Sequence, residues 1–175
     1  MEGDSGRAEQ LRRLFQAHHA DSVRLAFWLT ADWALAEELV QEAYLRLWRR
    51  WSGLRDQQAA LAYLRATVVN LARSSLRRRV LERRYGAAAT ERSVETDPVA
   101  RIDVGRALAA LPAGKRACVV LRYLVGLSVE ETAAVLGIST GGVKSQTHKG
   151  LRLLERALAD HEGPVGGHAR EVRGP

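Results

Sequence analysis

Apolar side chains recur at three- and four-residue steps along most of this chain, which is the period of an α-helix, and the alternation typical of half-buried strands is absent. The helical pattern covers residues 9–84 and returns over residues 101–160. Between them, residues 85–100 are small and polar and include a proline, which predicts a linker. Residues 161–175 hold too few apolar side chains to order themselves. We therefore expect an all-α protein with two small helical domains, a flexible linker and a disordered tail.

The second helical segment carries the signals of a helix-turn-helix. Ser128 stands three residues before Glu131, the spacing of a capping box in which each side chain bonds the other residue's free backbone N–H. The short helix that begins there ends at Gly137, which permits the left-handed backbone of a tight turn. Ser139 or Thr140 then caps the next helix. A capped helix, a glycine turn and a second capped helix together predict a helix-turn-helix domain.

The helix after this turn has two different faces. Its apolar face is made by Val143, Thr147, Gly150, Leu151 and Leu154. Its polar and cationic face is made by Lys144, Ser145, His148, Lys149 and Arg152. Short polar groups near the helix start suit base edges in the DNA major groove, and cations further along suit phosphates. The alternative is the solvated face of an ordinary bundle helix.

Two glycines, Gly141 and Gly142, stand at the start of this helix although glycine is a poor helix former. They let the backbone approach a phosphate, which exposed N–H groups at a helix start can bind. Each glycine then costs about 1 kcal/mol in helix propensity. The alternative is that both are neutral positions in a frayed first turn.

The strongest helical pattern lies in the first segment, at residues 31–51. Its glutamates come early and its arginines late, an order that suits the helix dipole. At the margin of its apolar stripe, Leu45 and Trp48 stand beside Gln41 and Glu42. A mixed acidic and apolar margin is what a protein-binding helix presents. A plain amphipathic core helix with a solvated acidic side is the alternative.

The next helix is expected over residues 59–84 and becomes strongly basic toward its end. Residues 71–84 hold six arginines against one glutamate. Asn70, Arg73 and Arg77 lie together on an outer face at i, i+3 and i+7. Such a face can follow a phosphate backbone while the asparagine reaches a base edge. The alternative is a solvated helix end that complements the dipole.

Composition narrows the class of protein. The 27 Lys and Arg against 20 Asp and Glu give a net charge of +7, which favours a polyanionic partner or simply keeps the protein soluble. The one cysteine, Cys118, excludes an internal disulfide and a multi-cysteine metal site, and its apolar surroundings indicate packing rather than redox sensing. No apolar run reaches the roughly 18 residues of a membrane span, and the N-terminus does not resemble a signal peptide. We expect a cytoplasmic, nucleoid-associated protein without membrane insertion, metal or cofactor.

Taken in order, these blocks resemble a sigma-70 family initiation factor of the extracytoplasmic-function (ECF) type. AEELVQEAYLRLW, residues 36–48, looks like that family's clamp-binding helix. AYLRATVVNLARSSLRR, residues 62–78, looks like its −10-element helix, and residues 111–151 look like its −35-element domain. The resemblance covers about residues 9–158. It implies that 9–84 is a region 2-like domain and 101–160 a region 4-like domain.

The resemblance also implies roles for residues of the first domain. The clamp coiled coil of the largest polymerase subunit would be bound by Leu39, Gln41, Glu42 and Leu45. A loop at residues 52–58 would capture a flipped base of the non-template strand. The upstream edge of the −10 element would be contacted by Asn70, Arg73 and Arg77.

For the second domain, the resemblance implies reading of the −35 major groove by Lys144, Ser145, His148 and Lys149, with Arg152 near a phosphate. Further implied partners are the flap of the second largest polymerase subunit, promoter DNA and an anti-sigma factor. The chain departs from the family pattern at Glu38, where Asp is usual, and at Gly142, where Thr is usual. The missing threonine hydroxyl implies one fewer phosphate contact and weaker −35 binding.

Two other classes of function compete with this interpretation. A stand-alone dimeric helix-turn-helix regulator with an N-terminal sensor or dimerisation domain predicts tight binding to palindromic duplex. An initiation factor predicts a monomer that uses asymmetric sites together with polymerase. An enzyme acting on nucleic acid would need clustered carboxylates or a metal-ligand set, and the sequence shows no such pattern and no nucleophile with its base.

Overall fold

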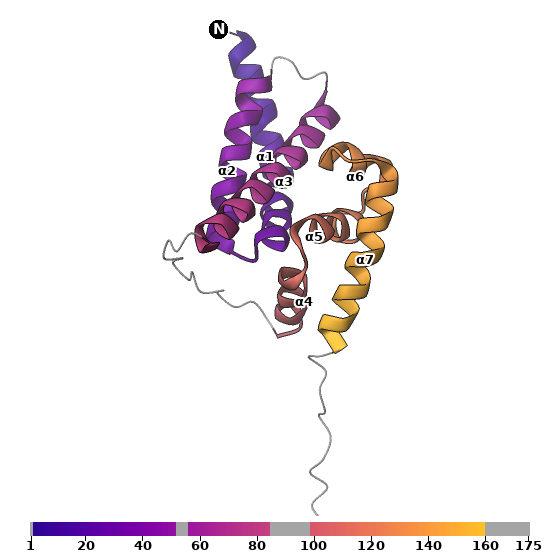
Figure 1. Ribbon diagram of the computed structural model, residues 1–175. Coiled ribbons are helices and arrows are strands. Elements are labelled where there is room, and N and C mark those ends of the chain that lie inside the picture. The colour runs from indigo at the N-terminus through magenta and orange to yellow at the C-terminus, as the bar shows by residue number, and fades with distance from the viewer. Residues whose placement is uncertain (1, 52–55, 85–98, 160–175) are drawn as a thin grey trace, which may run out of the picture.

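The computed structural model describes residues 2–51, 56–84 and 99–159. These residues form helices joined by short turns, and no strand occurs among them (Figure 1). In chain order the elements are α1 (Glu2–Thr30), α2 (Trp33–Arg50), α3 (Gln57–Arg84), α4 (Val99–Ala110), α5 (Ala113–Val119), the π-helix η2 (Val120–Leu124), α6 (Val129–Leu136) and α7 (Thr140–Ala159). The expected all-α class is confirmed.

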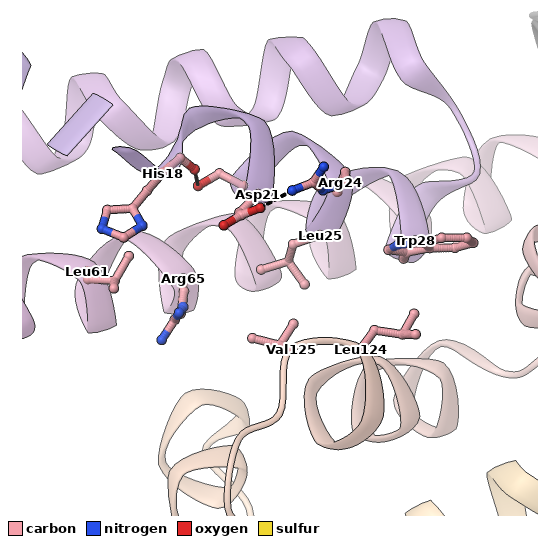
Figure 2. A pocket seen from close by; sticks show the side chains of 10 residues that line it. His18, Asp21, Arg24, Leu25, Trp28, Leu61, Arg65, Leu124 and Val125 are labelled. Carbon is pink, nitrogen blue, oxygen red and sulfur yellow. Dashed lines mark hydrogen bonds and ion pairs between the residues drawn. The ribbon is translucent and has the colours of Figure 1, made fainter. Parts of the chain in front are cut away.

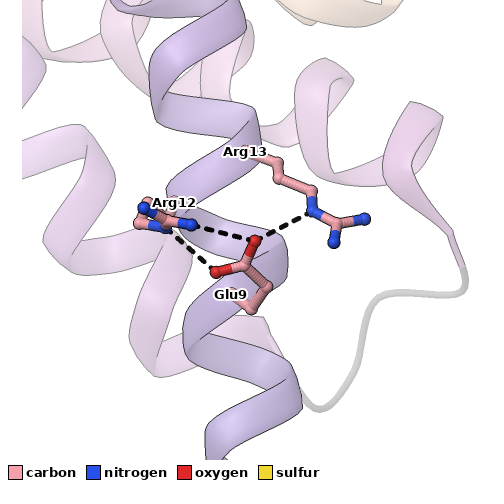
Figure 3. Close-up of polar contacts among 3 residues, drawn as sticks. All are labelled: Glu9, Arg12 and Arg13. Atoms are coloured by element: carbon pink, nitrogen blue, oxygen red, sulfur yellow. Dashed lines mark hydrogen bonds and ion pairs between the residues drawn. The ribbon is translucent and has the colours of Figure 1, made fainter.

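Helix α1 begins at Glu2, several residues before the start that the apolar period predicts. Charge pairs lie on its surface at residues 9–13. Glu9 accepts hydrogen bonds from Arg12 at 2.9 Å and from Arg13 at 3.0 Å (Figure 3). Pairs at i+3 and i+4 stabilise a helix, and the hydrogen bonds from Arg12 and then Arg13 lower the pKa of Glu9. A periodicity argument misses residues 2–8 because almost all of them are polar or glycine.

Two other boundaries differ from the sequence expectation. Helix α4 begins at Val99, within the expected linker, and residues 85–98 lie outside the described part of the chain. The expected tail, residues 161–175, also lies outside it. Helix α3 begins at Gln57, so the last two residues of the expected base-capturing loop are helical, while residues 52–55 are not described.

Two aspartates cap the helices of the first half. The Asp32 carboxylate accepts a hydrogen bond from the Leu35 N–H at 3.0 Å and so caps α2. Its other oxygen binds Arg79 of α3 at 2.8 Å. Asp56 accepts from the Ala59 N–H at 2.7 Å, which explains why α3 begins before its apolar period does. Asp32 therefore joins the start of α2 to the far end of α3.

Helices α1, α2 and α3 pack on one another, and α4 to α7 form a second layer beside them (Figure 1). The core of the first half is completed by Leu14, Leu29, Val40, Leu47, Leu64 and Val68, all fully or almost fully buried. The two halves meet along a seam, where α1 packs against α4, α5 and η2, and α3 packs against α5 and α6. These contacts form the seam between the two halves.

In the second half, α7 lies directly on α5 because of a glycine. A side chain at Gly150 would place its Cβ 2.7 Å from Val119 Cγ2 and 3.2 Å from the Lys115 carbonyl oxygen. The backbones of α5 and α7 can approach this closely only without a Cβ at that position. Beyond Val119 the helix widens to η2, in which the Val125 N–H donates to the Val120 carbonyl at 3.0 Å.

Candidate nucleic-acid interface

The expected helix-turn-helix is present as α6, a turn at Gly137, and α7. Both hydrogen bonds of the capping box form: the Glu131 N–H donates to Ser128 Oγ at 3.0 Å, and the Ser128 N–H donates to the Glu131 carboxylate at 2.7 Å. The backbone N–H of Ser128, followed by its hydroxyl, lowers the pKa of Glu131. Gly137 has φ of 63°, the left-handed conformation that the turn requires. The local signals therefore place α7 as the sequence predicted.

Of the two candidate caps for α7, Ser139 is the one used. Its hydroxyl accepts from the Gly142 N–H at 3.1 Å. The first turn of α7 is thus capped, and the Gly142 N–H already has an acceptor. At Gly141, a Cβ would meet nothing closer than Ser139 Oγ at 4.0 Å, so the surface above this residue is open. Gly141 is the better placed of the two glycines for close approach to a phosphate.

Helix α7 divides into faces as the helical wheel predicts. Val143, Thr147 and Gly150 are buried against the other helices of the second half. The candidate DNA-reading residues are all exposed: Lys144, Ser145, His148, Lys149 and Arg152. One helix face therefore presents hydroxyl and imidazole groups beside three cations, the donors that base edges and phosphates accept from.

The candidate −10 face of α3 is only partly free. Asn70 and Arg77 are exposed. Arg73 is half-buried, and its Nη1 donates to the Leu136 carbonyl oxygen at 3.2 Å. Leu136 is the last residue of α6, so a residue expected to touch one DNA element contacts the domain expected to touch the other. Sequence spacing identified this face but could not identify what packs against it.

The other arginines of the basic segment are divided in their roles. Arg78 lies 3.6 Å from Glu82 on the same helix, and Arg79 is bound to Asp32. The Arg79 pair spans two helices and its aspartate is largely buried. Arg79 is therefore a structural cation, a role that the count of arginines alone could not reveal.

On α2, three of the four expected partner-binding residues lie at the surface. Gln41 and Leu45 are exposed, with Leu45 at 53% of its area. Glu42 is half-buried and binds Arg46 at 2.7 Å. Leu39 differs because only 9% of it is exposed and it belongs to the hydrophobic core. Leu39 lies on the inner edge of the apolar stripe and packs in the core. Only Gln41, Glu42 and Leu45 therefore remain as surface candidates for partner binding.

A neighbouring apolar hollow was not anticipated from the sequence. It has a volume of about 400 Å³ and is lined by Ala8, Leu11, Arg12, Phe15, Tyr44 and Trp48. Phe15 is 43% exposed and its ring lies 5.0 Å from that of Tyr44, centroid to centroid. The sequence signal that could have predicted this hollow is the four-residue spacing of Leu11 and Phe15, which places both on one face of α1. The hollow extends the exposed surface of α2 onto α1.

The described residues hold no group of three or more His, Cys, Asp or Glu side chains able to bind a metal ion. Within the same residues, no helix is long and apolar enough to cross a membrane. Cys118 is fully buried, and burial raises the pKa of its thiol. Packing is therefore the role that the structure supports for this cysteine.

Comparison with known proteins agrees with this geometry. The family model "Sigma-70 region 2" matches residues 14–81, and "Sigma-70, region 4" matches residues 101–154. The chain is 35% identical over 157 residues to an RNA polymerase sigma-E factor of Streptomyces avermitilis, covering 86% of each chain. It is 34% identical over 161 residues to the ECF RNA polymerase sigma factor SigL of Mycobacterium tuberculosis, covering 87% of this chain and 91% of that one.

Solved structures share the fold at lower identity. The sigma factor RpoE of Bartonella quintana, solved with the anti-sigma factor NepR, has a TM-score of 0.69 at 23% identity and covers 90% of this chain and 97% of that one. CnrH, solved with the cytosolic domain of CnrY, has a TM-score of 0.61 at 22% identity, covering 87% and 88%. With both domain models matched in order and relatives aligned along most of its length, the chain belongs to the sigma-70 family of RNA polymerase sigma factors, among those of ECF type.

Proposed function

We propose that this protein binds core RNA polymerase and directs it to promoters through two separate DNA-contacting faces, one on α3 and one on α7. The observation that carries the proposal is the exposed basic face of α7 within a region 4 match, preceded by a region 2 match. In this role it is an initiation factor that recognises DNA and aids its opening, without catalysis or a cofactor of its own. It acts in the cytoplasm, on the nucleoid.

In this proposal the −35 element meets α7. The side chains offered to base edges are Lys144, Ser145, His148 and Lys149, with Arg152 on a neighbouring phosphate. A neutralised phosphate releases counterions, so Arg152 adds to the salt dependence of promoter binding. The exposed backbone at Gly141 adds a phosphate contact. This contact does not depend on the threonine hydroxyl that the family usually has at position 142.

The −10 element meets α3 through Asn70, Arg73 and Arg77, with the asparagine amide on a base edge and the guanidinium groups on phosphates. This assignment requires Arg73 to leave the Leu136 carbonyl. The polymerase clamp meets α2 through Gln41, Glu42 and Leu45, and the flap of the second largest subunit meets the second half. The anti-sigma factors crystallised with related folds support a regulator of that kind for this chain.

The proposal is tested by mixing the purified protein with bacterial core polymerase. Complex formation is measured by gel filtration, and promoter use is measured by run-off transcription on a fragment library of bacterial DNA. Leu45→Ala is expected to weaken the complex with core. Lys149→Ala is expected to lower transcription while leaving the complex intact.

A matched control for Lys149→Ala is Arg156→Ala, which removes an exposed cation two turns further along the same helix. Transcription by this variant is expected to equal that of the wild type. If the wild-type protein forms no complex with core, the proposal fails. If it instead binds a palindromic duplex unaided and as a dimer, the stand-alone regulator is the correct function.

A further inference from the structure

A cavity of about 250 Å³ lies between α1 and α3 on one side and the end of η2 on the other (Figure 2). Five of its ten lining residues are apolar and come from both halves of the protein: Leu25, Trp28, Leu61, Leu124 and Val125. Close-packed interiors leave few voids larger than a water molecule. An engineered apolar cavity of about 150 Å³ binds benzene, so this one has room for a single ring and a short polar arm.

Two nitrogen-bearing side chains of the cavity wall have no acceptor of their own. Arg65 of α3 is half-buried, and among the described residues it forms no ion pair within 4.0 Å. Its charge acts from beyond that distance on Glu131, whose carboxylate already accepts from the Ser128 N–H. The imidazole of His18 on α1 is also half-buried and makes no hydrogen bond to any side chain or backbone group of the described residues.

The other polar groups of the wall are engaged with one another. The Ser22 hydroxyl donates to the His18 carbonyl oxygen at 2.7 Å and so has no proton left to offer. Asp21 and Arg24 form an ion pair on α1, and their side chains are 65% and 59% exposed, which places them at the rim. Because Arg24 offsets the charge of Asp21, the donors that remain for an occupant are His18 and Arg65. Both can donate to an anion.

The polar and apolar parts of the wall are separated along α1. His18 and Trp28 are ten residues apart, which is about 15 Å along a helix axis. Figure 2 shows His18 and Arg65 toward one end of the cavity and Trp28 toward the other, with Leu25 and Val125 between them. An occupant that matches this wall therefore has an anionic group at one end and an apolar body beside it.

We propose that this cavity binds a small monocarboxylate whose apolar body is about the size of one aromatic ring. The carboxylate accepts two parallel hydrogen bonds from the Arg65 guanidinium and one from the His18 imidazole. The ring lies against Leu25, Leu61 and Val125. One negative charge matches the one guanidinium that lacks an ion pair, and the apolar wall favours an organic acid over inorganic phosphate.

This site goes beyond the promoter function proposed above and does not depend on it. No residue of the proposed DNA faces on α3 and α7 lines the cavity, and neither do Gln41, Glu42 or Leu45 of α2. Ligand binding can therefore be measured on the full-length protein without polymerase or DNA.

Phenylacetate is the probe. Isothermal titration calorimetry measures its affinity, and NMR of the methyl groups locates it. We expect the methyl signals of Leu25, Leu61 and Val125 to shift on titration, while those of Leu11, in the open apolar hollow of α1 and α2, stay unchanged. Phenylacetamide lacks the charge and acetate lacks the ring, so each is expected to bind at least about ten-fold more weakly than phenylacetate.

A variant tests the role of the guanidinium. Arg65→Met removes the charge and keeps an apolar stem, so we expect the affinity for phenylacetate to fall by at least about ten-fold. The matched control is Arg78→Met, which makes the same change at an exposed residue of the same helix outside the cavity. Its affinity is expected to equal that of the wild type.

Each outcome supports the carboxylate site or overturns it. Equal affinities for Arg65→Met and Arg78→Met overturn the pairing with Arg65, and equal affinities for phenylacetate and phenylacetamide overturn the preference for an anion. Methyl shifts that are absent, or that occur at Leu11 instead, overturn the location. If Arg65→Met does not fold, the three small molecules and the methyl shifts of the wild type still decide. Promoter use is measured separately by run-off transcription, so failure of one proposal leaves the other standing.

Discussion

Replacing Gly150 by alanine tests the close approach of α5 and α7. The added Cβ would lie 2.7 Å from Val119 Cγ2, whereas carbon atoms pack at about 3.5–4.0 Å, so the helices must separate by ~1 Å. Val119 is β-branched and cannot rotate away easily, and the Lys115 carbonyl at 3.2 Å belongs to the backbone. We therefore expect overpacking to lower the free energy of unfolding by about 3 kcal/mol, the upper part of the usual range. The higher helix propensity of alanine offsets ~1 kcal/mol of this loss, so the free energy of unfolding should fall by about 2 kcal/mol in total.

The assay is urea denaturation of the full-length protein, followed by circular dichroism. Gly141→Ala is the matched control because it changes a glycine of the same helix where a Cβ meets nothing closer than 4.0 Å. That variant is expected to keep or slightly raise the free energy of unfolding. If Gly150→Ala proves as stable as Gly141→Ala, the argument from close packing is refuted. Because α7 carries the proposed DNA-recognition face, the loss of stability at Gly150 should also lower promoter use.

Three further outcomes follow from the structure. Hydrogen bonds in the capping box lower the pKa of Glu131, so its carboxylate stabilises the fold above its ordinary pKa of 4.5 and loses that effect as pH falls below it. As pH is lowered through this range, the free energy of unfolding of Glu131→Gln should therefore fall less than that of the wild type. Asp32→Ala removes a helix cap and leaves Arg79 without this partner, so the unfolding free energy should fall by about 1–3 kcal/mol, whereas Asp21→Ala, at an exposed pair, should change it by less than ~0.5 kcal/mol. Arg152→Ala should reduce the slope of log affinity against log salt by about 1 in promoter binding by the polymerase complex, and an unchanged slope would contradict a phosphate contact.

The sequence by itself determined the features whose causes lie within a few residues of one another. The all-α class follows from a 3.6-residue period, and the start of α6 follows from Ser128 and Glu131, which are three residues apart. Gly137 marks the turn because few other residues adopt its backbone conformation. The faces of α7 follow from the wheel, so its exposed candidate residues were identified correctly as surface residues.

Only the tertiary structure decided which of these surfaces is free. Arg73 binds a carbonyl 63 residues away, Arg79 a carboxylate 47 residues away, and Arg116 a carbonyl 87 residues away. Nothing in their local sequence distinguishes these arginines from their exposed neighbours. Leu39 is likewise buried because of the helices packed against it, although the family resemblance groups it with exposed Leu45 as a polymerase contact. Periodicity specifies the direction in which a side chain leaves its helix, whereas its partner depends on how distant helices pack together.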